Sequence, residues 1–147
     1  MKTRPFFKDD IPACAALFLN VFNREPWNDQ WTIQLAVEYI EDVMNTPGFV
    51  GLVMEDSRKR EIIGFVIGAR KKWWNGDIFY LYEMCVGQAY QGKGIGKQLM
   101  EDTKTSLFQN GFSAIVLLTE RTFPSAHFYE KQGFIESPDT RFYYCGL

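Results

Sequence analysis

Alternating glycines mark a stretch near the middle of the chain, QAYQGKGIGKQL, which runs from Gln88 to Leu99. The three glycines are Gly92, Gly94 and Gly96. Glycine loses more backbone freedom on folding than any other residue, so a loop this rich in glycine lowers stability by itself. The apolar spacing that follows predicts a helix. Unpaired N–H groups at a helix start favour anions, and glycine lets a ligand approach the backbone closely. The stretch therefore indicates a loop that binds an anionic ligand.

Two other phosphate-binding motifs fit this loop less well. The dinucleotide fingerprint requires GxGxxG, whereas the spacing here is GxGxG. The Walker A motif requires GxxxxGK followed by Ser or Thr. The stretch from Gly87 to Lys93 matches GxxxxGK, but Gly94 stands where the magnesium-binding hydroxyl belongs. A nucleotide phosphotransferase is therefore a weak alternative, which predicts magnesium-dependent ATP binding.

The rest of the pattern predicts one mixed α/β domain over residues 1–147. The hydrophobic share of 46% is typical of a globular chain. In chain order, we expect a strand at 2–7, helices at 11–22 and 32–45, and strands at 49–56, 62–73 and 78–86. These are followed by a helix from 95 to a stop at 110–111, a short buried strand at 113–119, a helix at 124–132 and a last strand at 142–147. The pair Asn75-Gly76 suits a type I′ hairpin turn, and the apolar run at 78–86 predicts a central strand.

The charge, the cysteine content and the lack of long apolar stretches argue against nucleic acid, a metal ion and a membrane as partners of this chain. The net charge of −2 gives no reason to expect nucleic acid as a partner. Three widely spaced cysteines and a single histidine argue against a typical zinc site and predict no bound metal. The three cysteines are expected to be reduced, as in a cytoplasmic protein. No apolar stretch approaches 18 residues and the N-terminus lacks the core of a signal peptide, so no membrane association is expected.

Gln91, Gly94 and Gly96 form the spacing Q-x-x-G-x-G, directly after an apolar strand and before a helix. Here the sequence resembles the GNAT superfamily of N-acetyltransferases, in particular bacterial members of the small-molecule type that act on aminoglycosides or polyamines. The resemblance covers most of the chain and is most specific from about Phe79 to Phe134. It implies a mixed, mostly antiparallel sheet of about six or seven strands with about four flanking helices. It also implies a splayed cleft between the strand before the glycine loop and the strand after its helix.

In that family the glycine loop wraps the pyrophosphate of acetyl-coenzyme A. The resemblance implies that coenzyme contacts come from the loop and the first turn of its helix: Gln91, Gly92, Lys93, Gly94, Ile95, Gly96 and Lys97. Pantetheine lies along the open edge of the preceding strand, where Cys85 and Val86 would be its backbone partners. Many members place Asn seven residues before a tyrosine near the coenzyme sulfur. Thr122 stands at that position in this chain, which leaves that coenzyme contact open.

Two side chains are candidates for proton transfer. Tyr129, within SAHFYEKQGF, matches a family tyrosine near the coenzyme sulfur, which implies a general acid for the departing thiolate. Packing in the core at helical spacing is the alternative for this aromatic ring. Glu83 is a carboxylate in an otherwise apolar strand, where the family supports a base for the acceptor amine. An ion pair with Arg70 or Lys71 on the adjacent strand is the alternative for Glu83.

The acceptor site of GNAT proteins is formed by the first two helices and the meander. These regions hold tryptophans and acids suited to a cationic amine, and the candidate acceptor-binding residues are Glu25, Trp27, Trp31 and Asp77. For Trp73 and Trp74, an exposed hairpin tip or core packing explains the residues equally well. The stretch EPWN followed by Trp is similar to a loop in members that modify aminoglycosides.

The sequence thus predicts an acetyl-CoA-dependent N-acetyltransferase that acetylates a primary amine of a small molecule by direct attack in a ternary complex. Family members are often homodimers. A covalent Cys85 intermediate is disfavoured because nothing beside it in sequence activates a thiolate. Two alternatives remain open: a GNAT-like module that binds acyl-CoA without catalysis, and an acetyltransferase for protein or peptide amines.

Overall fold

The computed structural model describes all 147 residues as one five-stranded sheet with helices on both faces. The first half contains β1 (Lys2–Pro5), α1 (Ile11–Phe22), α2 (Ile33–Met44), β2 (Phe49–Asp56) and β3 (Glu61–Lys71). The second half contains β4 (Asp77–Val86), α3 (Ile95–Gln109), β5 (Phe112–Val116) and α4 (Pro124–Lys131). Short 3-10 turns precede α1 and the glycine loop. The strand order is β1-β2-β3-β4-β5, antiparallel except for the parallel pair β4 and β5.

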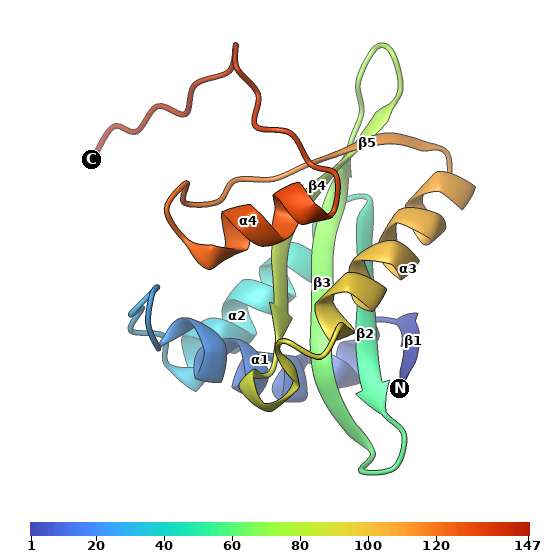
Figure 1. Cartoon of the computed structure of the whole chain (residues 1–147), viewed down its shortest axis with the longest axis vertical. Helices are drawn as coiled ribbons and strands as arrows, with labels where there is room; N and C mark the ends of the chain where they lie inside the picture. The colour runs from blue at the N-terminus through green and yellow to red at the C-terminus, as the bar shows by residue number, and fades with distance from the viewer.

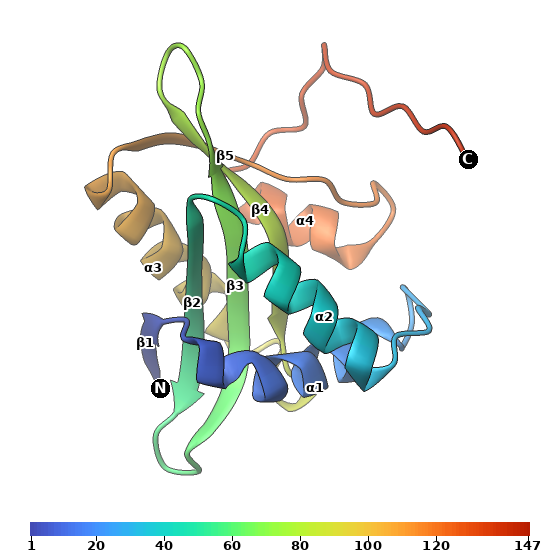
Figure 2. The ribbon, with the colours of Figure 1, turned by 180° about the vertical axis from the view of Figure 1, so that it is seen from behind.

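The helices cover opposite faces of the sheet and create two apolar cores. Figure 1 shows α3 and α4 in front of the sheet, and Figure 2 shows α1 and α2 on the opposite face. The core under α1 and α2 includes Phe18 and Ile40, and the core under α3 includes Leu99 and Met100. Apolar residues three or four apart line the buried side of each helix, as the sequence spacing predicts. Thr32 caps α2, since its Oγ1 accepts a hydrogen bond from Leu35 N at 3.2 Å.

A β-bulge at Tyr82 determines which face of the sheet the later β4 side chains occupy. Glu83 pairs with Ile67 and Leu81 pairs with Gly68, which leaves Tyr82 without an opposite residue. Side chains alternate along a strand, and an inserted residue reverses the alternation beyond it. Leu81 accordingly lies in the α3 core, whereas Cys85 lies in the core under α1 and α2. The bulge therefore turns the end of β4 toward the first two helices.

The strands β4 and β5 pair only along their first few residues. The pairs run from Asp77 with Phe112 to Tyr80 with Val116, where β5 ends. The edge of β4 from Leu81 to Val86 thus has no strand partner on that side. This separation confirms that the two strands splay apart, as the family resemblance implied.

Three sequence expectations are wrong in detail. The sheet has five strands rather than six or seven, because residues 142–147 form no strand. The strand expected at 113–119 is β5, an edge strand with exposed positions rather than a buried one. Asn75 does not have the positive φ that a type I′ turn requires, because a longer loop joins β3 to β4.

Candidate functional site

The glycine loop presents a run of main-chain N–H groups that have no partner in the protein. The N–H groups from Gly92 to Lys97 donate no hydrogen bond, and the first bond of α3 runs from Gln98 N to Gly94 O at 3.0 Å. Gly92 and Gly94 have φ values of 70° and 80°, in the left-handed region that other residues adopt only with strain. A Cβ on either glycine would have no atom within 4 Å, so the space above the loop is open. The loop therefore forms a free cradle of N–H donors at the start of α3, which favours an anion.

The side chains around the cradle fix its position. Gln91 donates from Nε2 to the carbonyl oxygen of Val86 at 2.9 Å, which ties the loop to the end of β4. Lys93 donates from Nζ to Ala89 O at 2.7 Å, and Lys97 lies 3.7 Å from Glu101. Both lysines are exposed beside the loop and add positive charge there. The Gln91 side chain thus holds the loop against the end of β4, while the two lysines make the electrostatic potential around the loop more positive.

Gly96 lets α4 approach the start of α3. A Cβ at this position would lie 3.3 Å from the ring of Phe128, tighter than normal packing allows. Phe128 comes one residue before Tyr129 on α4, so the contact brings the Tyr129 helix against the glycine loop. This glycine serves helix packing, unlike Gly92 and Gly94, which shape the open cradle.

The open edge of β4 begins beside this cradle and includes Cys85 and Val86. The Cys85 side chain is buried, with 4% of its surface exposed. Burial raises the pKa of its thiol well above the usual value, and the nearby Cys14 and Glu83 add to the effect. A neutral, enclosed thiol is a poor nucleophile, which supports the expectation that Cys85 forms no covalent intermediate.

Glu83 accepts a hydrogen bond from the phenol of Tyr39 on α2, at 2.9 Å between Oη and Oε1. The carboxyl group makes no ion pair, so the suggested pairing with Arg70 or Lys71 is wrong. Arg70 instead approaches Asp77 at 3.7 Å, because the bulge turns Glu83 toward α2. The pKa of Glu83 is raised from 4.5 to about 7, chiefly by burial; the Tyr39 hydrogen bond opposes the rise, and the charge of Asp29 adds a smaller contribution to it. Glu83 therefore titrates near neutral pH.

A chain of side-chain contacts runs from Glu83 to the loop between α1 and α2. The Tyr39 ring stacks on Trp31 with centroids 5.4 Å apart, and Trp31 Nε1 donates to Asp29 Oδ2 at 3.0 Å. Asn23 holds Trp31 from the other side with two hydrogen bonds of 2.8 Å to its main chain. Sequence spacing alone could not reveal the contact between Tyr39 and Glu83, because the two residues lie 44 positions apart in the chain.

Tyr129 lies on α4, its ring packed between Phe128 and Phe134 at centroid distances of 5.3 and 5.4 Å. No buried side-chain nitrogen or oxygen in the chain lacks a hydrogen-bond partner, so the Tyr129 hydroxyl, which bonds to no other group of the chain, is open to solvent. Burial raises the pKa of Tyr129 above its usual value, and negative charge on Glu83 and Cys85 raises it further. Tyr129 therefore lies within electrostatic range of Glu83 and Cys85. The Tyr129 hydroxyl stays protonated at neutral pH and is available as a proton donor.

The residues expected at the acceptor site are only partly gathered. Trp31 and Asp29 line a hollow of about 340 Å³ together with Gln30 and Leu35. Trp27 meets Phe123, just before α4, edge-on at 6.0 Å, so the α1–α2 loop touches the region of Tyr129. Glu25 is exposed on the same loop.

Three other residues of interest lie apart from this hollow. Asp77 lies at the opposite end of β4 from Glu83, in ion pairs with Arg70 and Lys72. Trp74 is 87% exposed at the β3–β4 hairpin tip. Thr122 is exposed in the loop before α4. Asp29 was not among the expected acceptor-binding residues, although it lay in the acidic loop that the sequence singled out.

No three His, Cys, Asp or Glu side chains are placed so that they could hold a metal ion. No helix combines the length and the apolar character needed to cross a bilayer.

The sequence matches the family model described as the acetyltransferase (GNAT) family over residues 16–134. Two curated relatives, both called uncharacterized N-acetyltransferase ycf52, are similar to parts of the chain. The protein from Porphyra purpurea is 31% identical over 90 residues, which is 61% of this chain and 49% of the relative. The protein from Pyropia yezoensis is 30% identical over 95 residues, which is 65% of this chain and 52% of the relative. The chain thus spans about half the length of the curated relatives it matches.

Solved structures share the fold over nearly the whole chain. A protein described as a possible acetyltransferase from Clostridium difficile 630 aligns with a TM-score of 0.83 at 16% identity, covering 99% of this chain and 97% of the other. Another solved structure is the aminoglycoside acetyltransferase meta-AAC0020 in complex with sisomicin, which comes from an uncultured soil metagenomic sample. It aligns with a TM-score of 0.74 at 20% identity. That alignment covers 99% of this chain and 96% of the other.

Proposed function

Because the chain belongs to the acetyltransferase (GNAT) family, we propose that it transfers an acetyl group from acetyl-CoA to a primary amine of a small molecule. The observation that carries this proposal is the cradle of free N–H groups from Gly92 to Lys97 beside the open edge of β4. A cradle at a helix start suits the pyrophosphate of the coenzyme. The unpaired edge from Leu81 to Val86 offers main-chain groups to an extended amide chain such as pantetheine.

The transfer takes place by direct attack with both substrates bound. A primary amine is mostly protonated at neutral pH, so it must first lose a proton. The Glu83 carboxylate accepts that proton, directly or through water, because its pKa of about 7 suits a general base. The amine nitrogen then bonds to the acetyl carbon, and the bond from that carbon to sulfur breaks. Tyr129 donates its hydroxyl proton to the departing thiolate, and the positively charged nitrogen of the new bond gives up its excess proton, through water, to the Tyr129 phenolate.

The main chain beside Cys85 supplies the third element of the proposed mechanism. The outer edge of β4 has no strand partner there, so its N–H groups are available to an oxygen that gains negative charge. Donors of this kind contribute roughly 3 kcal/mol to lowering a barrier. Glu83 and the open edge lie on the same stretch of β4, directly after the bulge at Tyr82. The strand therefore fixes the position of the Glu83 side chain relative to the N–H groups of that edge.

The loop before α2 is the proposed acceptor site. Asp29 and Trp31 face the same hollow, and a carboxylate next to an indole ring suits a cation. The charge of Asp29 also acts on Glu83, so the hollow lies within electrostatic range of the proposed base. An acceptor with more than one amino group could leave one ammonium at Asp29 and present another to Glu83. The fold shared with an aminoglycoside acetyltransferase agrees with an acceptor of this kind, although at 20% identity only the fold is comparable.

We expect the substitution Gly94→Ala to weaken coenzyme A binding roughly tenfold or more, because a residue with a Cβ at a φ of 80° carries strain of about 1–2 kcal/mol and shifts the N–H cradle. Isothermal titration with coenzyme A measures the change in Kd. Gly111→Ala is the matched control, since Gly111 also has a φ of 80° and no neighbour within 4 Å, but lies at the other end of α3. Equal weakening in both variants would contradict a specific role for the loop.

The substitution Tyr39→Phe is expected to move the acidic limb of the pH profile of kcat/KM to higher pH. The Tyr39 hydrogen bond lowers the pKa of Glu83, and its loss leaves burial unopposed. The measurement is kcat/KM against pH with a responsive amine, with Tyr82→Phe as the control, because Tyr82 makes no bond to Glu83. An unshifted limb would show that Glu83 is not the group that titrates in the profile.

A further inference from the structure

The helix α4, which carries Tyr129, lies at the surface of the protein, and none of its eight residues is fully buried. One attachment is Phe128, whose ring packs on Gly96 in the first turn of α3. A helix attached at a single point can pivot, and the Tyr129 hydroxyl would then change direction. The position of this hydroxyl therefore depends on what holds the other end of α4.

The chain folds back over Tyr129 directly after α4. The carbonyl oxygen of Tyr129 accepts hydrogen bonds from Gln132 N at 2.9 Å and from Phe134 N at 3.1 Å. Gly133 lies between these two donors with a φ of 84°, a left-handed conformation that commonly ends helices. The turn brings the Phe134 ring edge-on to the Tyr129 ring, with centroids 5.4 Å apart. A movement of this turn therefore moves Tyr129 as well.

Lys104 on α3 contacts the same turn in two ways. Its Nζ donates a hydrogen bond to the carbonyl oxygen of Gln132. The ammonium group also lies 5.2 Å from the centroid of the Phe134 ring, within the range of a cation–π interaction. A positive charge at the C-terminal end of a helix is favoured by the helix dipole. Lys104 forms no ion pair with a carboxylate, so the turn after α4 is the partner of its charge.

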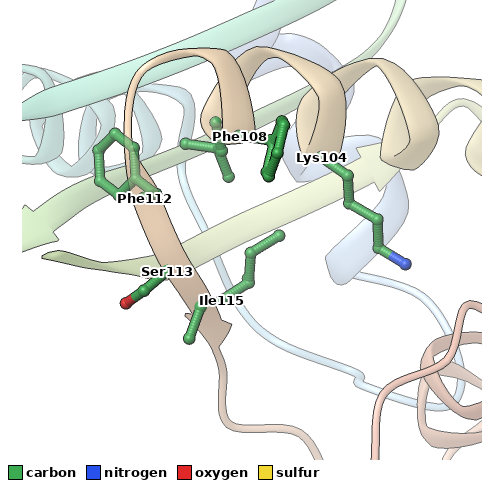
Figure 3. A pocket seen from close by; sticks show the side chains of 7 residues that line it. Lys104, Phe108, Phe112, Ser113 and Ile115 are labelled. Carbon is green, nitrogen blue, oxygen red and sulfur yellow. The ribbon is translucent and has the colours of Figure 1, made fainter. Parts of the chain in front are cut away.

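The stem of Lys104 lies on a well-packed part of α3. Thr103 and Leu107, on the same helix, are buried in the core. Figure 3 shows the Lys104 side chain at the rim of a hollow of about 240 Å³ beside β5, with its ammonium group pointing away from Phe112. Lys104 lies about two turns further along α3 than Gly96. The helix α3 thus holds α4 at two separate points.

We propose that Lys104 is a positioning residue for Tyr129, an inference that rests on the proposed function. By holding the turn after α4 on α3, the ammonium group fixes the direction of the Tyr129 hydroxyl. Burial and negative charge on Glu83 and Cys85 raise the pKa of Tyr129, and Lys104 is not among the groups that shift it. Lys104 therefore acts through the position of α4 and not through its charge on the phenol.

The variant Lys104→Met removes the ammonium group and keeps an unbranched apolar side chain along the hollow. Hydrogen exchange of the full chain, followed by mass spectrometry, should become faster for the main-chain amides from Phe128 to Phe134. The value of kcat should fall roughly tenfold, because a displacement of about 1 Å can cost about 10²-fold in rate. Kd for coenzyme A should stay the same. The control is Lys131→Met, which removes an exposed charge from the last turn of α4 and should change neither exchange nor kcat.

A double-mutant cycle with Tyr129→Phe separates an effect on Tyr129 from a general effect on the fold. Without the Tyr129 hydroxyl, Lys104→Met should lower kcat by less than about twofold, while exchange in α4 still becomes faster. An equal fall of kcat with and without the hydroxyl, an unchanged kcat, or unchanged exchange in α4 would overturn the inference. Failure of the proposed function is a distinct result, since the native chain would then release no thiol with any amine, and the inference would fall with it.

Discussion

Replacing Tyr129 by Phe is expected to lower kcat for acetyl transfer by roughly 10²- to 10³-fold, the usual contribution of a positioned general acid. The change removes one hydroxyl, which forms no hydrogen bond within the chain, so no partner is left unpaired. The ring keeps its contacts with Phe128 and Phe134, and the fold should keep its stability. Kd for coenzyme A should stay close to that of the native chain. Thiol release with a panel of amines measures kcat, and titration calorimetry measures Kd.

The control for this experiment is Tyr144→Phe, which removes a phenol hydroxyl from a residue that is 85% exposed and remote from the glycine loop. It should leave kcat unchanged. If Tyr129→Phe keeps full turnover, the hydroxyl is not the acid, and the ring serves packing alone. If the native chain binds coenzyme A but releases no thiol with any amine, the chain is an acyl-CoA-binding module, the alternative left open by the sequence.

Glu83→Gln is expected to lower kcat by roughly 10²- to 10⁴-fold and to raise stability at alkaline pH. The amide has the same shape and its oxygen still accepts the hydrogen bond from Tyr39, but it takes no proton from an ammonium. The acidic limb of kcat/KM near pH 7 should disappear with it. Initial rates over a range of amine concentrations at each pH give both kcat and kcat/KM and so check both effects.

The stability change follows from the pKa of Glu83, which folding raises from 4.5 to about 7. The folded state thus holds the proton more tightly than the unfolded state. The stability that this supplies is complete below about pH 4.5 and is lost as pH rises through 7. Glutamine carries no charge at any pH, so it avoids that loss. Above pH 7 the variant should be more stable by up to about 3 kcal/mol.

Urea denaturation at several pH values gives the difference in unfolding free energy between the variant and the native chain. The difference should grow between pH 4.5 and 7 and then level off. Glu130→Gln, an exposed change on α4, should show no such growth. A variant that loses stability above pH 7 would mean that Glu83 is ionised and stabilising in the folded protein, and the proposed base would then be wrong.

Much of the fold could be predicted because the signals are local. Helical spacing located α1, α2 and α3 to within a few residues, and Pro124 and Gly133 bracketed α4. The glycine loop was recognisable for the same reason. Glycine is the residue type that readily adopts the left-handed φ values seen at Gly92 and Gly94, and glycines are visible in the sequence. The open edge of β4 was inferred only from the resemblance to a family, and the register of β4 and β5 confirms it.

The sequence by itself determined the helices and the first five strands, the family and the N–H cradle, because these depend on neighbours within a few positions along the chain. Only the tertiary structure decided that Glu83 faces Tyr39 rather than Arg70, because one inserted residue at Tyr82 reverses every side chain beyond it. It also decided that residues 142–147 form no strand, because no neighbouring strand supplies hydrogen-bond partners for them. The residues of a segment determine which secondary structure it favours. Whether that structure forms depends on the hydrogen-bond partners that distant segments provide.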